Sequence, residues 1–92
     1  MPEIDVEQLL RVVVEIPEYR DLTPAERAEV LRVAQGFQCK DSAAAASVSP
    51  ETIRARRKRI YRKLRVPGAG ELIAALLARS LRKLGAARPP QP

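Results

Sequence analysis

The sequence predicts an all-α protein, and three observations support that prediction. Of the 92 residues, 46% are hydrophobic but only 3% are aromatic, so the core must be mostly Leu, Val, Ile and Ala. Thr23-Pro24 and Ser49-Pro50 each place a capping hydroxyl before a proline, which is the pattern of a helix start. Aliphatic residues also recur at spacings of three and four. We therefore expect one small domain of four helices, with an additional helix at the N-terminus.

Residues 1–21 are predicted to form an acidic helix followed by a linker. Asp5 begins a capping-box pattern, and apolar residues at helical spacing predict a helix from about residue 6 to residue 15. The β-branched run at 12–14 fits a strand equally well. Pro17 ends the element in either case, and the chain up to Leu22 is expected to be a linker.

The next two predicted helices are short. Thr23 and Glu26 form a second capping-box pattern, and Gly36 supplies the left-handed residue that ends this helix. Phe37 follows, and we expect it to fill space in the core. An alanine-rich helix is then expected over 41–46, where small side chains allow another helix to approach closely.

A strongly cationic helix is predicted over 50–65, with Ser49 as its N-cap. One of its faces suits docking on a core, because three aliphatic residues recur there at spacings of seven and four: Ile53, Ile60 and Leu64. Eight of the twelve residues from 54 to 65 are Lys or Arg, and none is acidic. Such a face suits a groove in a polyanion, because phosphates offset the self-repulsion. A solvated basic surface is the alternative, although solvated helices usually mix charges of both signs.

The cationic helix follows the alanine-rich helix after a tight turn at Ser47-Val48, and this arrangement predicts a helix-turn-helix. After a turn over 67–70, a last helix is expected to start at Glu71 and to end at Gly85. The tail over 86–92 is rich in proline, and we expect it to be disordered. The apolar face of the last helix is wider than a small core needs; it comprises Leu72, Ile73, Leu76, Leu77, Leu81 and Leu84.

Charge and composition narrow the function. The net charge is +6, with −4 in residues 1–21 and +10 in the remainder, which indicates an anionic partner and nucleic acid in particular. The single cysteine, Cys39, is expected to be an inert thiol and fits a reducing cytoplasm. With no histidine and scattered carboxylates, the sequence offers neither a zinc site nor a catalytic constellation, so we expect no cofactor and no enzymatic activity. No apolar run is long enough to span a membrane.

Three segments carry a resemblance to a known family: LTPAERAEVLRVAQG (22–36), VSPETIRARRKRIYRKLRV (48–66) and AGELIAALL (69–77). They resemble the DNA-binding domain of LuxR/GerE-type bacterial transcription regulators, and the resemblance covers about residues 22–80. It implies a four-helix helix-turn-helix fold without a wing, in a domain spanning 22–85. It also implies DNA binding as a homodimer, with the third helix in the major groove and the fourth helix at the dimer contact.

The resemblance implies positions for these contacts as well. The sites that contact bases and phosphates fall on Arg54, Ala55 and Lys58, and the family's threonine is Thr52. The basic pair Arg62-Lys63 would lie against the DNA backbone, and Thr52 and Arg57 are also counted among the expected DNA contacts. The dimer contact is expected at Leu72, Ala75 and Leu76, unless these residues complete the core of one monomer.

The chain also departs from the family pattern. Ser42 and Ala46 stand where larger apolar residues are usual, and Arg56 and Arg65 replace a typical His and Gly. The two arginines should raise non-specific affinity for DNA. About twenty residues precede the domain, too few for a receiver or a small-molecule-sensing domain, so no phosphorylation or autoinducer input is expected.

The leading hypothesis is a small stand-alone transcription regulator that binds double-stranded DNA. The alternative is a module that resembles region 4 of sigma factors, or an adaptor, which acts by contact with RNA polymerase or another regulator. Three roles stay open for the N-terminal helix. It could cover the core, compete with DNA for the cationic helix through its acids, or form a dimer contact through Leu9, Leu10, Val13 and Ile16.

Overall fold

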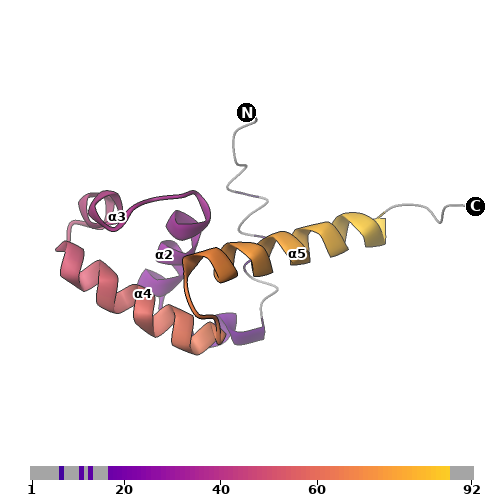
Figure 1. The fold of residues 1–92 in the computed structure, drawn as a ribbon, viewed down its shortest axis with the longest axis horizontal. Helices are drawn as coiled ribbons and strands as arrows, with labels where there is room; N and C mark the ends of the chain where they lie inside the picture. The colour runs from indigo at the N-terminus through magenta and orange to yellow at the C-terminus, as the bar shows by residue number, and fades with distance from the viewer. Residues whose placement is uncertain (1–6, 8–10, 12, 14–16, 88–92) are drawn as a thin grey trace, which may run out of the picture.

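The computed structural model describes residues 7, 11, 13 and 17–87, and every regular element in this part of the chain is helical. The elements are the 3₁₀ helix η1 (Pro17–Asp21) and the α-helices α2 (Pro24–Ala34), α3 (Cys39–Ala46), α4 (Pro50–Leu64) and α5 (Ala69–Ala87). Figure 1 shows α2, α3 and α4 gathered at one end, with α5 projecting beyond them. The predicted all-α fold is confirmed.

Helices α2 and α4 begin at the capping residues that the sequence indicates. The Thr23 hydroxyl accepts a hydrogen bond from the Glu26 N–H at 3.1 Å, and the Glu26 carboxylate accepts one from the Thr23 N–H at 2.8 Å. This reciprocal pair is a complete capping box. At the start of α4, the Ser49 hydroxyl accepts a hydrogen bond from the Thr52 N–H at 3.1 Å. Both predicted helix starts are confirmed.

Helices α2, α3 and α4 all end with a residue in the left-handed conformation. Gly36 has a φ of 86°, whereas Ser47 and Arg65 each have a φ of 57°. The next N–H then donates back into the helix, as when the Val66 N–H reaches the Tyr61 carbonyl at 2.9 Å. This pattern is the Schellman motif. The prediction for Gly36 is confirmed, and Ser47 and Arg65 adopt the same geometry although a Cβ atom disfavours it.

Three elements differ from their predicted boundaries. Helix α3, expected over 41–46, begins two residues earlier, at Cys39. The expected linker contains η1, which is tied to α2 because the Arg27 guanidinium lies 4.2 Å from the Tyr19 ring centroid. Helix α5 starts at Ala69, two residues earlier than expected, and it continues through Gly85 to Ala87. A glycine inside a helix costs only about 1 kcal/mol relative to alanine, so Gly85 alone does not end this 19-residue helix.

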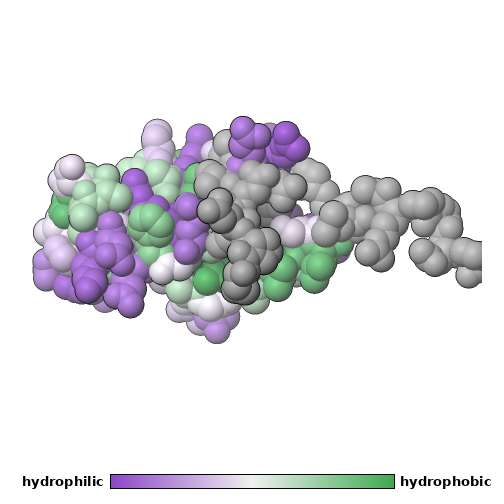
Figure 2. Space-filling view, turned by 90° about the horizontal axis from the view of Figure 1, so that it is seen from above, coloured by the Kyte–Doolittle hydropathy of each residue, from purple (hydrophilic) through white to green (hydrophobic). Residues whose placement is uncertain are grey.

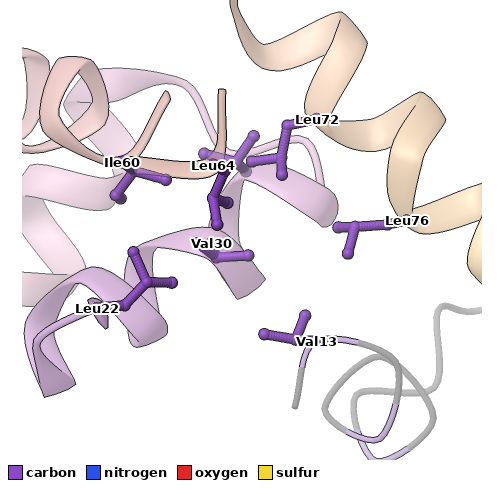
Figure 3. Close-up of a cluster of buried hydrophobic side chains, with 8 residues drawn as sticks. Val13, Leu22, Val30, Ile60, Leu64, Leu72 and Leu76 are labelled. Atoms are coloured by element: carbon purple, nitrogen blue, oxygen red, sulfur yellow. The ribbon is translucent and has the colours of Figure 1, made fainter. Parts of the chain in front are cut away.

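The core is an aliphatic cluster that α2, α4, α5 and the segment before α2 contribute. Figure 3 shows its side chains pointing toward one another from these elements. Its buried members are Val13, Leu22, Val30, Val33, Ile60, Leu64, Leu72 and Leu76. Phe37, which we expected to fill space in the core, is half-buried and lies outside this cluster.

The predicted N-terminal helix lies mostly outside the described residues. Glu7, Arg11 and Val13 are described, and all three are helical. Val13 is fully buried and points toward the core cluster in Figure 3, so this residue covers the core. The other residues proposed for a dimer contact in this helix, and most of its acids, lie outside the described part of the chain.

Candidate nucleic-acid interface

The aliphatic face of helix α4 is docked on the rest of the protein. Ile53, Ile60 and Leu64 are buried there, as their spacing predicts. Tyr61 lies beside them and is half-buried, and burial raises the pKa of its phenol, so this side chain contributes packing without charge. The docked side leaves the opposite side of α4 open to a ligand.

The open side of α4 carries a row of exposed cations. Arg54, Lys58 and Arg62 are all exposed, and their spacing of four places them along one side of the helix. Ala55 is exposed among them, and Arg65 is exposed just beyond the end of the helix. Figure 2 shows hydrophilic side chains gathered at this end of the molecule. We call Arg54, Lys58 and Arg62 the cationic row.

Arg57, one of the expected DNA contacts, points away from the cationic row and into the domain. Its Nε donates to the Glu29 carboxylate at 2.8 Å, and its Nη2 donates to the Phe37 carbonyl at 2.7 Å and to the Ser42 hydroxyl at 3.0 Å. Only 11% of the Arg57 side chain is exposed. This guanidinium therefore ties α4 to α2, to α3 and to the loop between them.

Glu29 and Ser42 make the burial of Arg57 possible. Glu29 is fully buried, and it also accepts a hydrogen bond from Arg32 Nη1 at 3.0 Å, so two guanidinium groups compensate its charge. Ser42 occupies a position where the family pattern has a larger apolar residue. Its small side chain leaves space for the guanidinium, and its hydroxyl accepts a hydrogen bond. Among the described residues, no buried side-chain nitrogen or oxygen is without a hydrogen-bond partner.

Lys63 also points away from the open side, toward Glu26 of α2. Its Nζ donates to the Glu26 carboxylate at 2.7 Å and to the Asp21 carbonyl at 2.9 Å. Arg59 lies farther from the same carboxylate, at 3.6 Å. Burial acts to raise the pKa of Glu26, but hydrogen bonds from Lys63 and Thr23 and the Lys63 charge outweigh it, so the pKa lies below its ordinary value. Glu26 therefore stays charged and holds this flank of α4.

The two exposed polar residues in the first turn of α4 interact within the helix. Thr52, the threonine of the family pattern, has its hydroxyl 2.9 Å from that of Ser49, and its N–H takes part in the cap. Glu51 accepts a hydrogen bond from Arg54 Nη2 at 2.8 Å, although 55% of the Arg54 side chain remains exposed. One nitrogen of the Arg54 guanidinium is therefore hydrogen-bonded to Glu51, and the side chain remains largely exposed to solvent.

The residues expected at the dimer contact do not share one surface. Leu72 and Leu76 are buried in the core of the single chain, and only Ala75 is exposed. A different set of aliphatic side chains on α5 is exposed, and Figure 2 shows hydrophobic surface along this helix. These side chains, the α5 stripe, are Ile73 (40% exposed), Leu77 (58%) and Leu81 (59%).

In the described part of the chain, no group of three or more metal-ligating side chains lies together. None of the described helices has the length and apolar character needed to cross a membrane. Cys39 is a half-buried thiol in the first turn of α3.

The sequence interpretation missed the two acids of α2 as partners of α4. Glu26 was identified only as a capping residue, and Glu29 was not singled out. A signal was present, because Glu29 lies directly beside Val30 in the predicted buried stripe of its helix. An acid at a buried position requires a cationic partner, and the predicted cationic helix has several.

The short helix α3, the tight turn and the docked helix α4 with its open cationic side define a helix-turn-helix domain of the DNA-binding class. The family described as "Bacterial regulatory proteins, luxR family" matches residues 20–76, and the chain belongs to this family of DNA-binding transcription regulators. The matched residues extend from η1 into α5, and the resemblance is confirmed. Neither the curated proteins nor the solved structures gave a match.

Proposed function

We propose that this protein is a bacterial transcription regulator that acts in the cytoplasm and places the open side of α4 in the major groove of double-stranded DNA. The cationic row is the observation that carries this proposal. Its three side chains face outward on a helix whose other sides are fixed by the aliphatic core and by Glu26 and Glu29. A rigid helix with one open cationic side can enter the groove without rearrangement.

Individual residues take different parts in this proposal. Arg54 and Lys58 lie in the N-terminal two-thirds of α4, the part of a recognition helix that approaches base edges. The small side chain of Ala55 allows close approach and suits contact with a thymine methyl group. Arg62 and Arg65 lie at the C-terminal end, where they would contact backbone phosphates.

Selection of bound sequences from a random pool of double-stranded DNA tests this function. We expect the protein to enrich a motif, and Arg54→Ala to reduce discrimination at one base pair by about 1–3 kcal/mol. Arg62→Ala is the matched control, because losing a phosphate contact weakens binding evenly across sequences. If Arg54→Ala also weakens binding evenly, Arg54 does not contact a base. Failure to enrich any motif would favour the alternative, contact with RNA polymerase or another regulator.

We also propose that the protein binds DNA as a homodimer through the α5 stripe. Ile73, Leu77 and Leu81 recur at spacings of four along α5, and the C-terminal part of this helix projects beyond the other helices (Figure 1). Burying them against the same residues of a second copy removes apolar surface from water. Ala75 lies about half a turn away from Leu77, so it does not belong to this contact.

Sedimentation in the presence of DNA with two half-sites tests the homodimer. Leu77→Glu should abolish cooperative binding of the second copy, because a charge would be buried in the contact. Ala75→Glu introduces the same charge on the other side of α5 and should leave cooperativity unchanged. Equal effects of the two substitutions would show that the α5 stripe is not the contact.

A further inference from the structure

Glu51 is an exception on α4, because it is the one acid of that helix and it lies on the open side. It precedes Lys58 by seven residues, or about two turns, so it shares the side of the cationic row. Its side chain is 77% exposed. A carboxylate at this position would face the DNA, where it would repel the phosphates that the neighbouring cations attract.

An acid at this position can stabilise the helix and contact DNA at the same time. A negative charge in the first turn favours the helix dipole. The Ser49 hydroxyl accepts a hydrogen bond from only one N–H at this end of α4, so Glu51 keeps this stabilising role. A carboxylate on a DNA-facing side is favourable when a hydrogen-bond donor on the DNA meets it. In the major groove, such donors are the amino groups of cytosine (N4) and adenine (N6).

The geometry of the Glu51–Arg54 pair suits a shared contact with bases. Arg54 Nη2 donates to Glu51 Oε1 at 2.8 Å, which holds the guanidinium in place. Arginine has five N–H donors, so donors remain for the O6 and N7 atoms of a guanine. The Glu51 carboxylate has its other oxygen to accept a hydrogen bond from a base. The pair thus presents donors and an acceptor side by side.

We propose that Glu51 is a specificity-determining residue that accepts a hydrogen bond from the N4 amino group of a cytosine and orients Arg54 toward a neighbouring guanine. The proposal rests on the proposed function, because it requires α4 in the major groove. In the major groove, cytosine presents its N4 amino group as a donor, and an acidic side chain is the acceptor that matches it. At other base pairs, the carboxylate meets acceptor atoms and opposes binding.

Selection from a random DNA pool with Glu51→Ala and Glu51→Gln, alongside the unsubstituted protein, tests this role. Glu51→Ala should lose about tenfold of the preference for cytosine at one position and keep the rest of the motif, while affinity for unrelated DNA rises. Glu51→Gln should shift the preference at that position toward adenine, because an amide can both accept from N6 and donate to N7. Glu71→Gln is the control, because it removes an exposed acid from the first turn of α5 and leaves α4 unchanged.

The outcomes separate this proposal from the proposed function. If the unsubstituted protein and both Glu51 variants enrich the same motif, Glu51 does not determine specificity, although DNA recognition stands. If the unsubstituted protein enriches no motif, the proposed function fails together with this inference. Circular dichroism of each variant verifies that α4 is still folded.

Discussion

Arg54 and Arg57 lie three residues apart on α4 and have opposite roles. Each pairs with a glutamate at 2.8 Å. The Arg54–Glu51 pair is exposed to water, which screens the attraction between the charges. Glu29 is fully buried, so its charge depends on the guanidinium groups around it. Burial therefore decides which arginine stabilises the fold and which stays exposed on the surface of α4.

Replacing each arginine by methionine should show this difference in stability. Arg57→Met removes one partner of a buried carboxylate, and we expect it to lower the free energy of unfolding by about 3 kcal/mol or more. Arg54→Met removes an exposed partner and should cost less than about 1 kcal/mol. Urea denaturation measures both values. If the two variants lose similar amounts of unfolding free energy, Arg57 does not stabilise the fold more than Arg54 does.

Arg65 combines an unfavourable backbone conformation with a useful charge. Arg65→Gly should raise the free energy of unfolding by about 0.5–1 kcal/mol, because glycine adopts a positive φ without a Cβ clash. It should also weaken DNA binding, because a cation is lost. Ser47→Gly relieves the same conformation without a change of charge. Ser47→Gly should therefore stabilise the protein and leave DNA affinity unchanged, as denaturation and mobility-shift titrations would show.

At the scale of the element, the cations of α4 have different surroundings on different sides of the helix. Arg62 and Lys63 are neighbours in sequence, yet Arg62 is exposed while Lys63 contacts Glu26 and Asp21. A step of one residue turns a helix by about 100°, so adjacent side chains face different surroundings. The predicted role of Arg62-Lys63 as a pair at the DNA backbone therefore divides into one outward cation and one that anchors the helix.

The salt dependence of DNA binding should distinguish these two neighbours. Each phosphate contact contributes about −0.9 to the slope of log affinity against log salt concentration. Arg62→Gln should reduce the magnitude of that slope by about this amount. Lys63→Gln should leave the slope nearly unchanged and instead lower the stability, because Glu26 loses its nearest cation. A slope that changes equally in both variants would place Lys63 on DNA.

At the scale of the whole molecule, the cations that pair with buried acids lie apart from the cations that stay exposed. The two buried acids of α2 pair with Arg57 and Lys63 on the inner sides of α4. The cationic row is left on the outer side, and the α5 stripe lies on a separate helix. The DNA contact and the dimer contact are thus proposed for different surfaces, so that both can be occupied at once.

Acid should weaken the fold through Glu26. Because the pKa of Glu26 in the folded protein lies below its ordinary value of 4.5, its contribution to stability is complete above about pH 4.5. The contribution is lost as the pH falls through the lower pKa of the folded state. Denaturation at a series of pH values should show this loss. Glu26→Gln should be less stable at neutral pH and should show a smaller decrease in acid, and an unchanged acid profile would contradict this assignment.

The starts of α2 and α4, the left-handed Gly36 and the docked face of α4 follow from the sequence because they depend on residues within a few positions of one another. The apolar spacing on α5 does not show which of its leucines are buried. They belong to two neighbouring faces of the helix, one buried and one exposed. The left-handed Arg65 could have been foreseen, because it stands where the family pattern has glycine. Its geometry is set by the chain reversal after α4.

The sequence by itself determined the helices, their order, and the helix that carries the charge, because capping, periodicity and charge are local properties of the chain. The tertiary structure alone decided which cations face outward, because Glu29 and Arg57 lie 28 positions apart and Glu26 and Lys63 lie 37 apart. No local pattern encodes such pairs. They form when burial in the folded core requires each carboxylate to have a partner.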